Sequence, residues 1–179
     1  MPSSPADAVL FTADQIRRRV AELARAIDAD HSGEQPLHVV TVLKGSFIFA
    51  ADLVRAMRTS STLDFIVAAS YASRTTSSGE IKLLKNLDSD IAGRPVLIIE
   101  DIVDTGRTLH HLQDVILARA PRNLRTACLL SKPSRRQVEL PIEYLGFEID
   151  DHFVVGYGLD HAELFRHLPH IAVLAGATD

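Results

Sequence analysis

The residues most suited to chemistry lie in one short stretch, residues 96–109, which reads VLIIEDIVDTGRTL. An apolar run of the kind found in buried strands ends there, and a set of functional side chains follows within a few positions: Glu100, Asp101, Asp104, Thr105, Gly106 and Thr108. The later residues are suited to hold an anion, whereas the three acids would repel one. The ligand must therefore offer both an anionic group and groups that a carboxylate can bind.

The segment from Asp104 to Thr108 follows an expected buried strand and precedes an expected helix. Unpaired backbone N–H groups and the helix dipole favour negative charge at a helix start. Gly106 allows close approach of the backbone to a ligand, and the hydroxyls of Thr105 and Thr108 are further donors. The segment is thus suited to a phosphate, although it is not a Walker A loop, because no G-x-x-x-x-G-K-[ST] occurs in the chain.

Carboxylates beside a phosphate site can accept hydrogen bonds from sugar hydroxyls or hold a magnesium ion that also touches the phosphate. A ribose phosphate would use both, with its phosphate at residues 105–108 and its 2′- and 3′-hydroxyls at Glu100 and Asp101. Each feature alone also has a plain structural interpretation, as a solvated strand end or a helix cap. The triplet Asp104-Thr105-Gly106 also matches aspartic proteases, but those enzymes pair two such triplets in an all-β setting, and no second one occurs here.

Composition restricts the class of protein. The chain has 179 residues, of which 46% are apolar and 23% charged, as expected for one globular domain spanning residues 1–179. The net charge of −4 and the lack of a basic run argue against nucleic acid as a partner. Cys128 is the only cysteine, in an apolar segment that indicates a buried, reduced thiol. No apolar run approaches the roughly 20 residues of a membrane helix, and no signal peptide is evident, which predicts a cytoplasmic protein.

Apolar periodicity indicates the elements that must position these residues. Thr12 and Gln15 form a capping box before a helical pattern that continues to Ile27, and further helices are expected at residues 47–57 and 109–116. Strands are expected at residues 37–43, 63–71, 81–87, 96–99, 126–130, 142–147, 153–155 and 171–174, the last two closing the sheet. Residues 1–11 are expected to be an arm and residues 72–79 a mobile loop.

Strands that alternate with helices predict an α/β fold with a mainly parallel sheet. Ligands bind outside the carboxyl ends of the strands in such sheets. Three polar segments begin at those ends, namely residues 44–46, 100–108 and 132–136. We therefore expect these segments to form one site.

The stretch from Glu100 to Thr108 closely resembles the phosphoribosyl-pyrophosphate signature of type I phosphoribosyltransferases. Other segments narrow the resemblance to hypoxanthine-guanine phosphoribosyltransferases, bacterial hypoxanthine phosphoribosyltransferases in particular. These segments are LKGS at residues 43–46, SY at 70–71, LSKPSRR at 130–136, FVVGYGLD at 153–160 and FR at 165–166. The resemblance extends in order from about residue 37 to 174, which makes it far more specific than any single motif.

The resemblance implies a type I phosphoribosyltransferase fold: a mainly parallel twisted sheet flanked by helices, with a small hood region and a mobile lid loop. It implies purine salvage, in which the phosphoribosyl group of 5-phosphoribosyl 1-pyrophosphate (PRPP) passes to N9 of hypoxanthine, and of guanine, giving IMP or GMP and pyrophosphate. The implied cofactor is Mg²⁺, and the implied assembly is a homodimer or homotetramer.

The resemblance also implies a role for individual residues. Asp104 would be the catalytic acid/base near N7 of the purine. The peptide before the glycine of the Leu-Lys-Gly loop would have unusual geometry. The other implied sites are 5′-phosphate (Asp104, Thr105, Gly106, Arg107, Thr108), ribose and magnesium (Glu100, Asp101), second magnesium (Asp160), pyrophosphate (Lys44, Gly45, Arg166), purine (Lys132, Phe153, Val154) and lid (Ser70, Tyr71).

Other functions remain open at this point. A regulator with the same fold could bind pyrimidine-pathway messenger RNA, but it would need a basic face that the sequence does not indicate. Orotate or adenine transferases would share the phosphate loop, although Lys132 suits a 6-oxo group and not a 6-amino donor. The preference among hypoxanthine, guanine and xanthine cannot be predicted from the sequence. The broadly apolar helix expected at residues 47–57 predicts a subunit contact.

Overall fold

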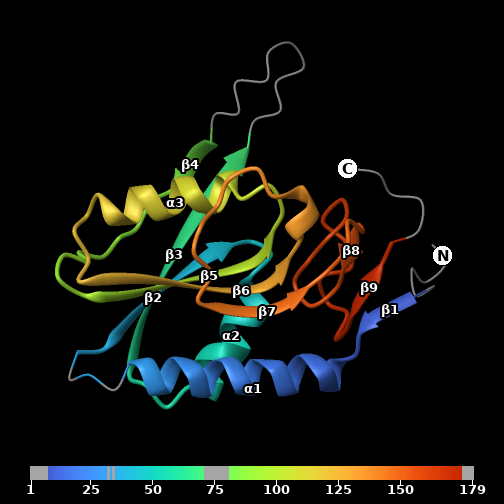
Figure 1. The fold of residues 1–179 in the computed structure, drawn as a ribbon, viewed down its shortest axis with the longest axis horizontal. Coiled ribbons are helices and arrows are strands. Elements are labelled where there is room, and N and C mark those ends of the chain that lie inside the picture. Colours follow the sequence, from blue (N-terminus) through green and yellow to red (C-terminus); the bar gives the residue numbers. More distant parts are fainter. Residues whose placement is uncertain (1–7, 32, 34, 71–80, 175–179) are drawn as a thin grey trace, which may run out of the picture.

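The computed structural model describes residues 8–31, 33, 35–70 and 81–174, and its main feature is a six-stranded sheet (Figure 1). The strand order is β4-β3-β2-β5-β6-β7, in which β4 alone is antiparallel to its neighbour. The strands of this sheet are β2 (Leu37–Leu43), β3 (Ser61–Ser70), β4 (Ile81–Lys85), β5 (Pro95–Val103), β6 (Asn123–Ser131) and β7 (Tyr144–Glu148). The predicted mainly parallel α/β fold is confirmed.

Three α-helices cover the two faces of this sheet (Figure 1): α1 (Ala13–Asp30), α2 (Phe47–Ala56) and α3 (Arg107–Leu117). The predicted capping box of Thr12 and Gln15 is present at the start of α1. Helices α1 and α2 pack with residues such as Val39 and Leu97 on one face. On the other face α3 packs with Val40 and Ile98. Alternate residues of one buried strand therefore serve two separate cores, which explains why β2 and β5 are apolar almost throughout.

A second, smaller sheet corrects two of the predictions. Its order is β1-β9-β8, with β1 (Ala8–Phe11), β8 (Val154–Val155) and β9 (Ile171–Val173), all antiparallel. Residues 8–11 are therefore a strand and not part of an arm, while residues 1–7 lie outside the described residues. The segments at 153–155 and 171–174 do not close the main sheet, because they pair with each other and with β1. This small sheet is the hood region that the resemblance implied.

None of the helices in the described part of the chain is long and apolar enough to cross a membrane.

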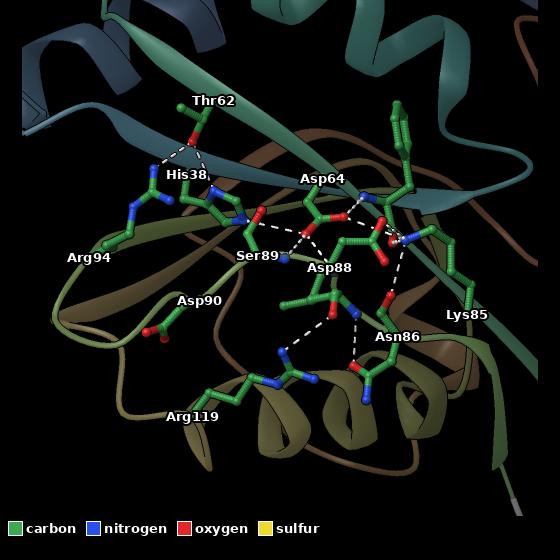
Figure 2. A network of polar contacts seen from close by, with 12 residues as sticks. His38, Thr62, Asp64, Lys85, Asn86, Asp88, Ser89, Asp90, Arg94 and Arg119 are labelled. Carbon is green, nitrogen blue, oxygen red and sulfur yellow. Dashed lines mark hydrogen bonds and ion pairs between the residues drawn. The ribbon is translucent and has the colours of Figure 1, made fainter.

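A buried polar network fastens the segment between β4 and β5 to the sheet (Figure 2). The Asp64 carboxylate is 4% exposed and accepts hydrogen bonds from the backbone N–H groups of Phe65, Asp88 and Ser89. The Lys85 ammonium lies 3.6 Å from it, and His38 Nε2 lies 3.9 Å away. Burial alone would raise the pKa of Asp64, but the hydrogen bonds from the backbone outweigh burial, and the pKa lies below its ordinary value of 3.8.

We expect Asp64→Asn to lower the free energy of unfolding by about 1–3 kcal/mol at pH 7, because buried donors lose a charged acceptor. The folded-state pKa of Asp64 is below 3.8, so its contribution is present above that pH and is lost as the pH falls further. Urea unfolding between pH 7 and pH 3 measures both effects. Asp88→Asn is the matched control, since that carboxylate is 79% exposed and its pair with Lys85 should contribute little. Equal losses in the two variants would contradict the role of Asp64.

Candidate active site

The carboxyl ends of β5 and β6 meet the hood sheet at a small cavity of about 240 Å³. The cavity is lined by Asp101, Ile102, Asp104, Lys132, Phe153, Val154, Leu159 and Asp160. Parallel strands end at the same edge of a sheet, so β5 and β6 bring Asp104 and Lys132 together although they are distant in sequence. Residues expected at the ribose, the purine and a metal thus share one cavity.

Two adjacent acids, Glu100 and Asp101, lie near the end of β5. Glu100 is 7% exposed, and its carboxylate accepts a hydrogen bond from the backbone N–H of Asp101. Burial and the neighbouring charge of Asp101 raise the pKa of Glu100 well above its usual range. Burial also raises the pKa of Asp101. A group that approaches with positive charge or hydroxyl donors would stabilise both carboxylates in their charged form.

Gly45 allows the loop after β2 to pack directly on Asp101. A Cβ atom at this position would overlap the Asp101 carboxylate, so any side chain here would displace the acid or the loop. Ser46, which is fully buried, fixes the loop by donating a hydrogen bond to the Val42 carbonyl. The unusual peptide in this loop is Leu43–Lys44, which is cis, and not the peptide that directly precedes the glycine. The expected position was wrong by one residue.

The expected phosphate segment forms the start of α3. Gly106 is the N-cap residue, with a left-handed φ of 85°, and no side chain caps the helix there. The backbone N–H of Arg107, the first of α3, donates a long hydrogen bond of 3.4 Å to Thr105 Oγ1, and the N–H groups of the next residues of the first turn have no partner within the helix and can meet a ligand. A Cβ at Gly106 would collide with Leu140 and the Val138 carbonyl, and the backbone N–H of Val138 donates to the Thr105 carbonyl at 3.2 Å. Residues 138 and 140 thus hold the loop in place on the side away from the helix start.

The residues expected to bind pyrophosphate meet at an acid that the sequence did not suggest. Lys44 Nζ lies 2.9 Å from a carboxylate oxygen of Glu163, and Arg166 Nη2 lies 3.0 Å from the other. These two cations lower the pKa of Glu163. Arg166 also pairs with Asp160 at 2.8 Å. Loops far apart in sequence therefore bring both cations to one place, as their expected roles require, although Lys44 itself is largely exposed.

Lys132 and Phe153, which were expected to contact the purine, both line the cavity. Lys132 is 4% exposed, and its ammonium lies 3.2 Å from Asp151, a partner that the sequence did not predict. Phe153 contacts His161 edge to face, with ring centroids 5.3 Å apart. Ser70 ends β3, whereas Tyr71 lies outside the described residues, so the expected lid remains a prediction.

The donor chemistry here suits a magnesium ion, which prefers oxygen ligands and shares them with substrate. Within the described residues no group of three or more His, Cys, Asp and Glu side chains could hold a metal by itself. Asp101 and Asp160 supply oxygens to the lining of the cavity, and Glu100 is buried directly beside Asp101 in the chain. The raised pKa values of Glu100 and Asp101 indicate carboxylates that a cation would stabilise. These residues fit an ion that completes its coordination with substrate oxygens.

Comparison with known proteins agrees with this geometry. The phosphoribosyl transferase domain family matches residues 10–162, and the chain belongs to this family. It is 44% identical over 164 residues to the hypoxanthine phosphoribosyltransferase of Escherichia coli strain K12, covering 91% of this chain and 92% of that protein. It is 46% identical over 169 residues to the hypoxanthine-guanine phosphoribosyltransferase of Dictyostelium discoideum, with coverage of 93% and 94%.

Solved structures show the same similarity. A hypoxanthine-guanine phosphoribosyltransferase from Bacillus anthracis superposes with a TM-score of 0.88 at 47% identity, covering 93% of this chain and 98% of that one. The hypoxanthine phosphoribosyltransferase of Trypanosoma cruzi, in complex with the product IMP, gives a TM-score of 0.90 at 39% identity, with 98% of both chains covered.

We expect Gly45→Ala to reduce kcat/KM for phosphoribosyl transfer on the order of a hundredfold, because a misplacement of about 1 Å in a site has that effect. Steady-state kinetics and thermal unfolding should be measured together. Gly33→Ala is the matched control, since a Cβ there meets nothing within 4 Å. An active Gly45→Ala enzyme would show that the contact with Asp101 is unimportant.

Proposed function

We propose that this protein transfers the phosphoribosyl group of PRPP to N9 of hypoxanthine, and of guanine, and releases pyrophosphate. Its role would be purine salvage in the cytoplasm. The observation that carries the proposal is the cavity in which Asp104, Lys132 and Phe153 face the same space as Asp101 and Asp160. A 6-oxopurine needs a group that accepts its N7 proton, a donor to its O6 oxygen and an aromatic side chain against its ring. The ribose of PRPP needs carboxylates that accept hydrogen bonds from its hydroxyls.

On the purine side, three side chains have distinct tasks. Asp104 accepts the proton from N7, which makes N9 a better nucleophile. The buried ammonium of Lys132 donates a hydrogen bond to O6, where electron density collects as the proton leaves. Phe153 packs on the ring face, while the backbone at Val154 meets the edge of the base. A 6-amino group offers no acceptor of this kind to Lys132, which disfavours adenine.

On the phosphoribosyl side, the binding groups follow the charge of the substrate. The N–H groups at the start of α3, with Thr105, Arg107 and Thr108, hold the 5′-phosphate. Glu100 and Asp101 accept hydrogen bonds from the ribose hydroxyls, and Lys44, the backbone at Gly45 and Arg166 bind pyrophosphate. Magnesium held by Glu100, Asp101 and Asp160 would neutralise the charge of the leaving pyrophosphate.

Relatives support this choice of substrates, since one solved neighbour is described with IMP as its product. The preference among 6-oxopurines is the remaining choice. Measuring kcat/KM for hypoxanthine, guanine and xanthine with PRPP settles it, and failure to release pyrophosphate with any of the three would refute the proposal.

We expect Asp104→Asn to lower kcat by about 10²- to 10⁴-fold, the usual contribution of general acid–base catalysis. The KM for PRPP should change little, because an asparagine keeps the shape of the phosphate loop. Asp114→Asn on α3 is the matched control, because Asp114 is exposed and pairs only with His110 in the described structure. Near-normal turnover of Asp104→Asn would show that Asp104 is not the catalytic acid/base.

We also propose that the protein forms a homodimer or homotetramer through the α2 side of the sheet. Phe47, at the start of α2, is 45% exposed. Leu63 and Phe65 of β3 are 51% and 37% exposed, and they pair in register with Val39 and Thr41 of β2. Val39 packs in the same core as α2, so Leu63 and Phe65 project from the face that α2 covers. Exposed apolar residues gathered on one face favour a protein contact.

Sedimentation velocity at low micromolar concentration should give no major monomer species. Phe65→Asp would place a charge in the contact and should shift the protein towards monomer. Leu117→Asp is the control, because this exposed leucine lies on α3, at the opposite face. A fully active wild-type monomer would refute the assembly.

A further inference from the structure

A row of four alternating charges joins the two sides of the purine site. Arg135 Nε lies 3.1 Å from an oxygen of Asp104, and Arg135 Nη1 lies 3.5 Å from an oxygen of Asp151. The other oxygen of Asp151 lies 3.2 Å from Lys132 Nζ. The row runs Asp104, Arg135, Asp151, Lys132, with the proton acceptor at one end and the O6 ligand at the other. Neither middle residue was assigned a role from the sequence, although Arg135 lies in the segment 132–136 that was expected at the site.

The local backbone explains how Arg135 reaches both acids. Strand β6 ends at Ser131, and Lys132 follows as the N-cap of the short 3-10 helix Pro133–Arg135. The backbone N–H of Arg135 donates to the Lys132 carbonyl at 3.2 Å. This tight turn returns the guanidinium towards the end of β5, where Asp104 lies. Asp151 approaches from the segment between β7 and β8, so the row connects three separate parts of the chain.

Asp151 stabilises the buried ammonium of Lys132. An ammonium that is 4% exposed is costly unless it has an anionic partner. Asp151 supplies that partner. Because an ammonium carries three N–H groups, one bond to Asp151 fixes its direction while others can face the cavity that Lys132 lines. Loss of the Asp151 charge would leave the ammonium buried and poorly directed.

The planar guanidinium of Arg135 can contact two acids at once. A guanidinium presents several N–H donors in a rigid plane, and here two different nitrogens serve two different acids. A lysine at this position would keep the positive charge but has one nitrogen on a flexible chain. Arg135, Asp104 and Asp151 are 39%, 35% and 44% exposed, so these contacts add little to stability, and their main effect is to set positions.

We propose that Arg135 and Asp151 are positioning residues that hold Asp104 and Lys132 in a fixed relation, so that proton removal at N7 and the hydrogen bond to O6 act on the same bound purine. This inference rests on the proposed function. It assigns the two ends of the row different kinetic effects. Asp151 governs how well the base binds, and Arg135 governs how well Asp104 is placed for proton transfer.

The test is a double-mutant cycle with hypoxanthine and PRPP as substrates. We expect Asp151→Asn to raise KM for hypoxanthine by about three- to tenfold, and Arg135→Gln to lower kcat by a similar factor, the range that corresponds to the net contribution of one hydrogen bond. KM for PRPP should stay close to wild type in both variants. The thermal unfolding midpoint should stay close to wild type in Arg135→Gln, whereas Asp151→Asn should lower it, because the buried ammonium of Lys132 loses its anionic partner. In kcat/KM for hypoxanthine, the double variant should lose less than the product of the two single-variant losses, because either change alone already breaks the row.

Arg135→Lys separates bridging from charge. We expect it to lose as much kcat as Arg135→Gln, because Arg135 reaches the two acids through two different nitrogens, and the single nitrogen of a shorter lysine would have to lie within reach of both. Asp150→Asn, in the exposed residue next to Asp151, is the matched control and should behave as wild type. A wild-type-like Arg135→Lys enzyme, or independent effects in the cycle, would overturn the bridge alone. A wild-type protein that transfers nothing to hypoxanthine would refute the proposed function, and the bridge with it.

Discussion

The constraint on which the site depends is the burial of two adjacent carboxylates, Glu100 and Asp101, at the end of an apolar strand. Burying charged groups is unfavourable unless nearby groups stabilise them. The two carboxylates interact with each other, and burial increases the need of each for a stabilising group beside it. Asp101 also needs a glycine, Gly45, to make room for it. The loop at residues 44–46, the start of α3 and the hood sheet are arranged around this point.

The chain also supplies partners for the cations that the proposed reaction uses. Glu163 accepts from both Lys44 and Arg166, and Asp151 holds Lys132. Such internal pairs direct long side chains that would otherwise sample many rotamers. In the proposed site, pyrophosphate would compete with Glu163 for the same two cations. Its affinity would then be the difference between two sets of ion pairs and not the sum of one set.

The sequence predicted the parts of this site that are contiguous. A buried strand, an acidic end, a glycine and a helix follow one another in residues 96–117, and strong local signals of this kind indicate both the element and the class of ligand that it suits. The strand before Lys132, which is β6, was predictable for the same reason. Strands β1, β8 and β9 were harder, because each is four residues or shorter, and β1 finds its partner, β9, across the length of the chain.

The side-chain pairs that complete the site could not be predicted. Asp151, Glu163 and Arg135 are charged residues in polar segments, and such residues are mostly solvated. Nothing in their local pattern distinguishes them from Asp150 or Glu139. Their partners are set by the return of distant loops to one strand edge, which requires the tertiary structure. The cis peptide at Leu43–Lys44 could not be predicted either, because cis peptides are rare without a proline and none follows Leu43.

The pairing of β1 with β9 affects the order in which parts of the structure can form during synthesis. Ala8 pairs with Val173, and β9 also joins β8, beside Phe153 and Val154. A ribosome releases the phosphate-binding strand and helix, residues 95–117, long before β9 emerges. The cavity wall at Phe153 and Val154 is completed only when β9 pairs with β8. The proposed base site therefore requires nearly the whole described chain, whereas the proposed phosphate site is contiguous in sequence.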